Sequence, residues 1–279
     1  MIMSLVKMKE LLERAQKNNI GCGAFSVGNM EMVRGAIQAA EELDTPIILQ
    51  IAEVRLKHSP LHLMGPMMVQ AAKEAKVDVA VHLDHGLTFE TVQKALELGF
   101  TSVMLDASTL PFEENIEEVK RAVEYCHFYN VPVEAELGCL QGKEEDIVNE
   151  ADAKTDPDMV ADFVAQTGCD LLAVAVGNVH GLDIEPKVDL PLLEQISKIS
   201  PVPLVMHGGS GIPFDIIQKA REFNLLKVNY GSDLRKAFVS TFGRAYETNH
   251  NACSVIELSI EAVENVSEKA AELVTIINS

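Results

Sequence analysis

The sequence predicts an α/β fold, a (β/α)8 TIM barrel with an N-terminal helix and a C-terminal helical extension. Short apolar segments alternate with segments of helical periodicity, which is typical of parallel strands joined by helices. The alternation occurs eight times within 279 residues, and a closed barrel of this kind needs about 250. No Pro- or Ser-rich stretch and no shift in composition divides the chain, so we expect one domain over 1–279.

The strands are predicted from apolar runs that are bounded by Gly, Pro or charged residues. Pro46 precedes the second run, and the third, Val79-Ala80-Val81-His82-Leu83-Asp84-His85-Gly86, ends in a carboxylate, an imidazole and a glycine. We expect the eight strands at 21–27, 47–52, 79–86, 102–106, 132–136, 170–176, 202–206 and 225–229.

Helical periodicity defines the segments that follow these strands, and Asn29 is a suitable cap for the first of them. We expect these helices at 29–43, 61–76, 88–98, 112–129, 157–166, 189–198, 213–222 and 231–249. An amphipathic helix in 1–19 precedes the barrel and does not have the pattern of a signal peptide. A helix in 254–278 is expected to pack outside the barrel or against another subunit. The polar segment 138–155 is expected to be a long loop.

The composition disfavours several classes of partner. A formal net charge of −19 argues against binding to nucleic acid or to anionic membranes. Aromatic residues make up only 5% and Trp is absent, so no surface for stacking bases is expected. No apolar run approaches the roughly 18 residues that span a bilayer. The five cysteines are widely spaced without a C-x-x-C pair, which favours reduced thiols in a cytoplasmic protein.

Three histidines occupy equivalent positions at the predicted carboxyl ends of strands. His85 ends the third strand, His180 follows the sixth, and His207 ends the seventh, each beside a glycine. The loops at these ends carry the chemistry of such barrels. Any one of these histidines alone is more simply a hydrogen-bonded residue at the rim. Three in equivalent loops favour a catalytic Zn2+ site with an open fourth position.

Carboxylates at the same ends are candidates for proton transfer and for further metal binding. Asp84, in the third strand, can move a proton to or from a substrate hydroxyl, or else orient a metal-bound imidazole. Asp106 and Glu136 end the fourth and fifth strands and can bind a second metal position, or act as structural acceptors. Glu144 lies in a glycine-hinged acidic segment, which is either a mobile flap that carries a base or a solvated surface loop.

Two glycine-rich turns lead into the last two barrel helices. They are His207-Gly208-Gly209-Ser210-Gly211 and Asn229-Tyr230-Gly231-Ser232-Asp233. Backbone N–H groups at helix starts attract anions, and the loops after strands seven and eight form the usual phosphate cradle of such barrels. The two turns therefore predict a phosphate site.

Seven ordered motifs resemble those of the class II, zinc-dependent ketose-bisphosphate aldolases, which include fructose-1,6-bisphosphate and tagatose-1,6-bisphosphate aldolases. The resemblance runs over residues 8–242, and the set is far more specific than any single motif. The motifs are GAFSVGNME at 23–31, HLDHG at 82–86, SVMLDAS at 102–108, VEAELG at 133–138, GNVHG at 177–181, HGGSG at 207–211 and KVNYGSD at 227–233.

The resemblance implies a role for each matching residue. Asp84 is implied to handle the proton of the C4 hydroxyl, and Glu144 to take the α-proton from the ketone half. The implied zinc ligands are His85, His180 and His207, with Glu136 as an associated ligand. The residues implied to surround the phosphate and a monovalent cation (Na+ or K+) are Gly181, Gly208, Ser210 and Ser232. Asn229 is implied to contact the substrate hydroxyls.

The implied activity is that of a carbon–carbon lyase, the reversible aldol cleavage of a ketose bisphosphate to dihydroxyacetone phosphate and an aldehyde. Zinc polarises the ketone, Asp84 deprotonates the C4 hydroxyl, and the C3–C4 bond breaks. The resemblance also implies a homodimer or homotetramer that acts in carbohydrate metabolism such as glycolysis.

Several residues depart from the family pattern around the phosphate and the far end of the substrate. Ser26 replaces a usual Asn, Ala52 replaces a polar residue, and Gly231 stands where some members have Asp or Ala. The segment 182–186 is short and lacks a lysine that is often present. The resulting hypothesis is an active aldolase whose acceptor aldehyde differs from glyceraldehyde 3-phosphate.

Other interpretations of the same residues remain open. The substrate can be a singly phosphorylated ketose, or the enzyme a zinc-dependent sugar-phosphate epimerase or isomerase. A Schiff-base aldolase needs a lysine at a strand end inside the barrel, but the sixth strand has none and Lys227 precedes the Asn229 motif. An inactive zinc-stabilised binding protein is disfavoured by the presence of Asp84 and Glu144.

Overall fold

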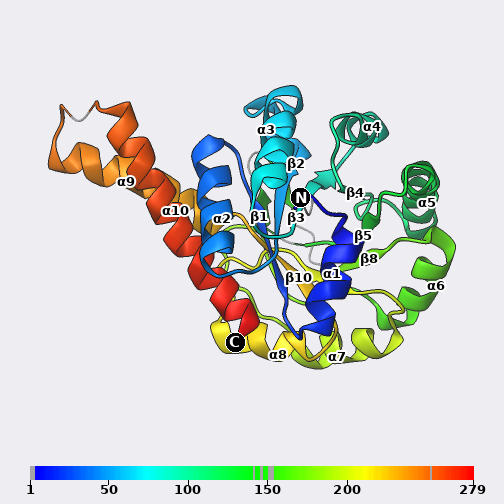
Figure 1. Cartoon of the computed structure of the whole chain (residues 1–279). Helices are drawn as coiled ribbons and strands as arrows, with labels where there is room; N and C mark the ends of the chain where they lie inside the picture. Colours follow the sequence, from blue (N-terminus) through cyan, green and yellow to red (C-terminus); the bar gives the residue numbers. More distant parts are fainter. Residues whose placement is uncertain (1–3, 141, 145–146, 150–153, 252) are drawn as a thin grey trace.

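The computed structural model describes residues 4–140, 142–144, 147–149, 154–251 and 253–279. Eight parallel strands close into a barrel in the order β1-β10-β9-β8-β5-β4-β3-β2, and Cys22 pairs with Lys227 where β1 meets β10 (Figure 1). The predicted fold class is confirmed. The barrel strands are β1 (Cys22–Ser26), β2 (Ile47–Ala52), β3 (Val79–Gly86), β4 (Ser102–Leu105), β5 (Val133–Leu137), β8 (Leu171–Val174), β9 (Leu204–Met206) and β10 (Leu225–Tyr230).

Eight helices surround the barrel in the described chain, and the predicted cap of the first of them, Asn29, is confirmed. The Asn29 side chain accepts a hydrogen bond from the Met32 backbone, and Thr88 accepts one from Thr91. Each predicted barrel helix is present, with ends that differ by at most two residues. The helices are α2 (Met30–Glu42), α3 (Leu61–Glu74), α4 (Phe89–Glu97), α5 (Phe112–Phe128), α6 (Pro157–Thr167), α7 (Leu190–Ile199), α8 (Phe214–Arg221) and α9 (Ser232–Thr248).

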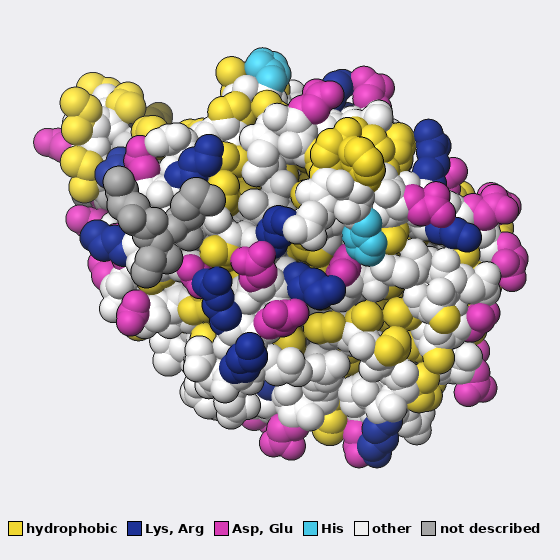
Figure 2. Space-filling model, turned by 45° about the vertical axis from the view of Figure 1, so that its right-hand side comes forward, with side chains coloured by type: hydrophobic (Ala, Val, Ile, Leu, Met, Phe, Trp, Pro, Cys, Tyr) yellow, Lys and Arg dark blue, Asp and Glu magenta, His cyan; other side chains and the backbone are white. Residues whose placement is uncertain are grey.

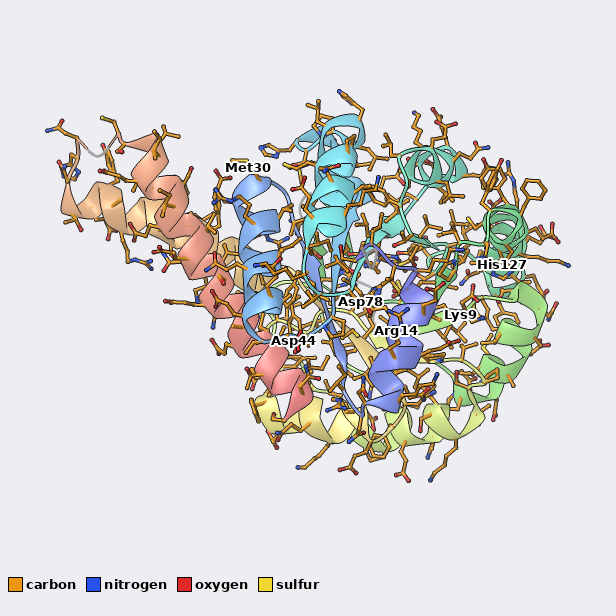
Figure 3. The ribbon with its side chains drawn as sticks, in the orientation of Figure 1. Lys9, Arg14, Met30, Asp44, Asp78 and His127 are labelled. Atoms are coloured by element: carbon orange, nitrogen blue, oxygen red, sulfur yellow. The ribbon has the colours of Figure 1, made fainter. Side chains whose placement is uncertain are left out.

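Helix α1 (Met8–Lys17) closes the amino-terminal end of the barrel with one buried face. It begins later than predicted, because the chain before it forms a parallel bridge from Leu5 to Val79, the first residue of β3. Residues 1–3 of the predicted helix lie outside the described residues. The exposed face of α1 forms an ion pair from Lys9 to Asp170. A second pair joins Arg14 to Asp78, which lies just before β3 (Figure 3).

Helix α10 (Val255–Asn278) packs outside the barrel against α2, which is one of its two predicted placements. The two helices approach closely at Gly35, where an added Cβ would lie 2.7 Å from Cγ1 of Val266. With α9, helix α10 forms a helical hairpin whose far end projects beyond the barrel (Figure 1). In the described part of the chain, no helix has the length and apolar character needed to cross a membrane.

Two short elements that were not predicted occur in the described residues, one after β2 and one in the predicted loop 138–155. A 3-10 helix, η1 (Glu53–Lys57), follows β2, and the segment 138–155 contains a two-stranded antiparallel pair of β6 (Gly142–Glu144) and β7 (Ile147–Asn149). Elements this short bury little apolar surface, so they leave no periodicity in the sequence. Contacts to neighbouring loops fix η1, because the Glu53 carboxylate accepts hydrogen bonds from the backbone of Leu87 and Thr88.

The barrel interior changes from apolar to polar along the strands. Near α1, the residues Ile48, Ala80 and Leu171 belong to the same apolar cluster as Met8. Toward the carboxyl ends the interior is polar and still buried. These buried polar residues are Gln50, His82, Asp84, Glu134, Glu136, Lys227 and Asn229. Because burying polar groups is costly unless they are used, the carboxyl end of the barrel is the place to look for a site.

Candidate metal and substrate site

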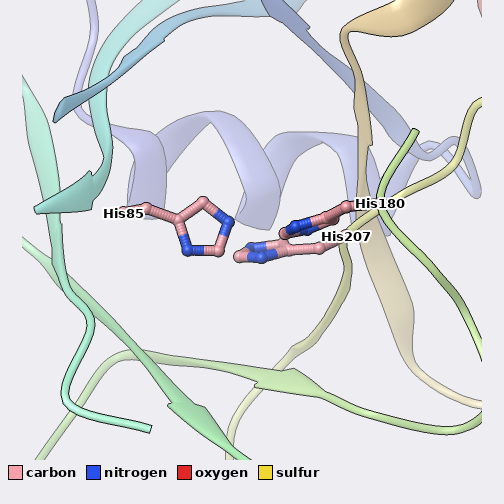
Figure 4. Close-up of side chains that lie close together, drawn as sticks. All are labelled: His85, His180 and His207. Carbon is pink, nitrogen blue, oxygen red and sulfur yellow. The ribbon is translucent and has the colours of Figure 1, made fainter. Parts of the chain in front are cut away.

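Three imidazoles meet at the carboxyl ends of the barrel strands (Figure 4). His85 is the residue before the last in β3, His180 lies in the segment after β8, and His207 follows β9 directly. Ring centroids are 4.5 Å apart for His85 and His207, 5.2 Å for His85 and His180, and 6.2 Å for His180 and His207. One ring nitrogen of each lies within 4.8 Å of the others. Nitrogens at this spacing can share one tetrahedral ion and leave its fourth position open.

The backbone at His85 adopts a conformation that is costly for a residue other than glycine. Its φ is +40°, in the left-handed region. Its Nδ1 donates to Oδ2 of Asp106 over 2.6 Å, which leaves Nε2 for an ion. Burial alone would raise the pKa of Asp106, but hydrogen bonds from His85 and Ser108 hold it well below its usual range. Asp106 is therefore a charged carboxylate that orients the His85 ring.

His207 and Glu136 place two buried polar atoms opposite each other. Nε2 of His207 donates to Oε1 of Glu134 over 2.8 Å, which leaves Nδ1 as the ring nitrogen available to an ion. This Nδ1 lies 3.3 Å from Oε2 of Glu136, and neither atom has a hydrogen-bond partner among the described residues. Such orphaned buried atoms are rare, and a bound cation would satisfy both. Glu136 also belongs to a second possible ligand group, with His85 and Asp106.

The groups around His207 and Glu136 raise the pKa of both side chains, so a cation bound between them would compete with protons. Burial and the Asp106 carboxylate raise the pKa of Glu136. Burial and the neighbouring His85 lower the pKa of His207, but the Glu134 and Glu136 carboxylates outweigh them and raise it to about 9. A metal ion that binds Nδ1 must displace this proton, so its affinity increases with pH.

Asp84 faces the same cavity from β3 and is held by two amides. Its carboxylate accepts hydrogen bonds from Nε2 of Gln50 over 2.8 Å and from Nδ2 of Asn229 over 3.1 Å. Gln50 also donates to Oγ of Ser26 over 3.0 Å. The two amides fix the orientation of the carboxylate and leave its remaining lone pairs for a substrate proton.

A charged network that the sequence did not predict lies beneath the imidazoles. Nζ of Lys227 donates to both Glu134 oxygens over 2.8 and 3.1 Å, and both side chains are fully buried. Burial and Lys227 lower the pKa of the adjacent His82, which keeps this ring neutral. Because Lys227 is ion-paired, it is not the neutral amine that a Schiff base needs. The sequence signal that could have predicted this network is the presence of charged residues at inward-facing positions of otherwise apolar strands.

The two glycine-rich turns line the cavity at the start of α9. Gly208 has a φ of +62°, and an added Cβ would lie 2.0 Å from the Val179 carbonyl oxygen, so the turn requires glycine. The backbone N–H of Asp233 donates to Oγ of Ser210 over 3.2 Å and ties the two turns together. Gly209 packs behind the turn, where an added Cβ would lie 2.5 Å from Val228. The predicted substrate residues that line the cavity are Gly181, Gly208, Ser210, Asn229, Gly231 and Ser232.

Three further residues line this cavity, although the sequence did not predict that they contact substrate. They are Ser26, Arg55 and Arg235. Ser26 was noted only as a departure from a pattern, Arg55 falls in a segment without periodicity, and Arg235 lies in the predicted helix 231–249 but outside the glycine-rich motif. The remaining predicted residue, Glu144, has its backbone in β6, but its side chain lies outside the described part of the structure.

Comparisons with known proteins agree on one family. The family model described as class-II fructose-bisphosphate aldolase matches residues 6–279. A fructose-bisphosphate aldolase of Thermus caldophilus is 42% identical over 262 residues, which cover 85% of this chain and 86% of that protein. One of Geobacillus stearothermophilus is 41% identical over 240 residues, with 85% and 84% covered. The crystal structure of the YdjI aldolase from Escherichia coli K12 superposes with a TM-score of 0.87 at 34% identity, covering 98% and 97%.

Proposed function

The chain belongs to the class II fructose-bisphosphate aldolase family and is an aldolase, and on this premise we propose that it is a zinc-dependent enzyme for ketose phosphates. The proposed products are dihydroxyacetone phosphate and an aldehyde. The observation that carries the proposal is the convergence of three imidazole nitrogens within 4.8 Å, beside the Asp84 carboxylate. When bound there by His85, His180 and His207, Zn2+ supplies a Lewis acid that polarises the substrate ketone.

The chain's own residues supply the other steps. Ser210, Ser232 and the start of α9 bind the phosphate, and Gly181 is among the residues that would hold a Na+ or K+ ion, which would balance the phosphate charge. Asp84 takes the proton of the C4 hydroxyl as the C3–C4 bond breaks, so C4 becomes the aldehyde carbonyl. The electron pair passes to C3, which is conjugated with the ketone. C3 then gains a proton, a step that we assign to Glu144, and dihydroxyacetone phosphate is released.

We expect a retro-aldol assay with a panel of ketose phosphates to show zinc-dependent release of dihydroxyacetone phosphate. The panel includes fructose and tagatose 1,6-bisphosphates and their 1-phosphates, with metal content measured in parallel. Chelation should remove the activity and added Zn2+ should restore it. Borohydride with substrate should not inactivate the enzyme, because no Schiff base forms. Cleavage that survives complete metal removal, or isomerised ketose without cleavage, would contradict the proposal.

The proposed assembly is a homodimer or homotetramer that uses the projecting α9–α10 hairpin. Side chains at the start of α10 are strongly exposed although apolar, with Val255 at 73%, Ile256 at 75% and Ile260 at 49%. Hydrophobic atoms gather on the projecting part of the molecule (Figure 2). A cluster of this kind is typical of a surface that another protein covers.

Ile256→Asp is expected to lower the molar mass of the oligomer in sedimentation experiments, because a carboxylate buried in the interface opposes association. Leu63→Asp is the matched control, since Leu63 is a single exposed leucine on α3 at 63%. The control should keep the wild-type mass. A wild-type monomer, or an Ile256→Asp variant of unchanged mass, would count against this assembly.

Cytoplasmic action is part of the same proposal. Cys22, Cys126 and Cys169 are buried thiols, and burial raises the pKa of each to about 12, which makes them unreactive. Buried reduced thiols suit a reducing compartment. The net charge of −19 disfavours nucleic acid and anionic membranes as partners. The proposed partner is a small phosphorylated sugar.

A further inference from the structure

Asn178 places a buried amide between the two segments that carry His180 and His207. The side chain is only 2% exposed, and both ends of the amide form a hydrogen bond. Its Oδ1 accepts from the Val176 backbone N–H over 2.8 Å, and its Nδ2 donates to the His207 backbone carbonyl over 2.9 Å. The second bond joins residues that are 29 positions apart, so the amide ties the segment after β8 to the end of β9.

Backbone pairing between β8 and β9 stops before either histidine. In the described part of the chain, the last residues that pair between these strands are Ala173 and Val205. The ladder therefore does not fix the position of His180 relative to His207. A side-chain amide offers the same donor and acceptor groups as a peptide unit. Asn178 thus adds a link between the two strands beyond the end of their ladder.

The segment after β8 is closed at its base by bonds within itself. The Lys187 N–H donates to the Gly177 carbonyl over 2.9 Å, and the Asp189 N–H donates to the Val176 carbonyl over 2.7 Å. Gly177 has a φ of +91°, and an added Cβ there would lie 2.1 Å from the Lys187 carbonyl oxygen. These bonds fix the shape of the segment, but they do not fix its position relative to β9.

The backbones of the two segments also touch at Val179 and Gly208. An added Cβ on Gly208 would lie 2.0 Å from the Val179 carbonyl oxygen. This steric contact limits how closely the segments approach, whereas the Asn178 hydrogen bond is directional and resists sliding. The rings of His180 and His207 lie nearby, with centroids 6.2 Å apart and planes inclined by 21° (Figure 4).

We propose that Asn178 is a positioning residue of the metal site, which holds the segment of His180 at the distance from His207 at which both imidazoles reach one ion. This inference rests on the proposed zinc dependence. Hydrogen-bond partners of metal ligands commonly orient them, and loss of such a partner weakens metal binding. Carboxylates act in this way on the rings of His85 and His207, whereas Asn178 acts on the backbone that separates two ligands.

The test measures the affinity for Zn2+ by competition with a chelator and, as a second readout, the visible spectrum of the Co2+-loaded protein. Asn178→Leu keeps the approximate size of the side chain and removes both bonds, so it should weaken Zn2+ binding about 10- to 100-fold. The Co2+ bands report the geometry of the ligands and should change as well. Asn178→Ser keeps a hydroxyl that can replace only part of the amide, and its loss of affinity should be intermediate.

Ser4→Ala is the matched control. The buried Ser4 hydroxyl donates to the Ala72 carbonyl over 2.7 Å, and the Ser4 carbonyl accepts from Val79, the first residue of β3. This link is of the same kind as that of Asn178, but it lies at the amino-terminal end of the barrel. The control should lower the thermal midpoint and leave the Zn2+ affinity and the Co2+ spectrum unchanged.

Two results would overturn the role of Asn178. One is a folded Asn178→Leu protein with the Zn2+ affinity and Co2+ spectrum of the wild type. The other is an equal loss of Zn2+ affinity in Ser4→Ala at a similar thermal midpoint, because the effect would then be one of general stability. If Asn178→Leu does not fold, Asn178→Ser is judged by the same two results. A wild-type protein that binds no Zn2+ would instead refute the zinc dependence, and with it this role.

Discussion

Asp84→Asn is expected to lower kcat for ketose cleavage about 100- to 10,000-fold while Zn2+ remains bound. The substitution keeps the size of the side chain, removes its ability to take a proton and replaces one of its two accepting oxygens by a donor. Asp84 does not contact the imidazole nitrogens through any hydrogen bond described in the structure, because its oxygens accept from Gln50 and Asn229. The metal ligands should therefore keep their positions.

Proton exchange at C3 of dihydroxyacetone phosphate separates the two possible roles of Asp84. Exchange with solvent deuterium, followed by NMR, does not involve the C4 hydroxyl and should persist in Asp84→Asn. If Asp84 instead positions His85 and the metal, exchange and cleavage should fall together and zinc content should drop. Asp189→Asn, which removes a carboxylate at the start of α7, is the control and should leave all three readouts unchanged.

The barrel was predictable because its signal is repeated. Apolar runs such as 79–83 and segments of helical periodicity such as 29–43 recur eight times, and a local error at one element is corrected by its neighbours. Short features lack this redundancy. The helix η1 spans five residues and is fixed by Glu53 bonds to another loop, so no pattern within 53–57 indicates it.

The site was predictable where a residue type has few other uses at a strand end. Histidine beside glycine at positions 85, 180 and 207 has this property, and the structure brings the three together. Residues that act through another side chain were not predicted from the sequence. Glu134 is two residues before Glu136 and could have been any buried acid, because its role depends on Lys227, 93 residues away. Asn178 likewise gains its role only from the His207 carbonyl, 29 residues away.

Glu134→Gln is expected to destabilise the protein by about 3–5 kcal/mol, because it leaves the Lys227 ammonium buried without its counter-ion. The amide oxygen of the substituted side chain would still accept the hydrogen bond from Nε2 of His207, so the metal site keeps its support while the ion pair is lost. For a chain of this size the thermal midpoint should fall by roughly 6–15 °C. Glu90→Gln, which breaks the exposed pair with Lys94 on α4, should leave the midpoint unchanged.

The double variant Glu134→Gln with Lys227→Met distinguishes a broken pair from a poorly packed side chain. Removal of both charges should recover most of the lost stability, giving a coupling of about 2 kcal/mol or more in a double-mutant cycle. The pH dependence supplies a second readout. Burial raises the pKa of Glu134, but Lys227 and His207 outweigh it and hold the pKa well below its usual range. The stabilisation is therefore complete above the unfolded value of about 4.3 and is lost as the pH falls toward the folded value. The opposite result would be a double variant that is as unstable as Glu134→Gln and keeps the acid sensitivity of the wild type. It would mean that the buried charges do not couple β5, which carries Glu134, to β10, which carries Lys227.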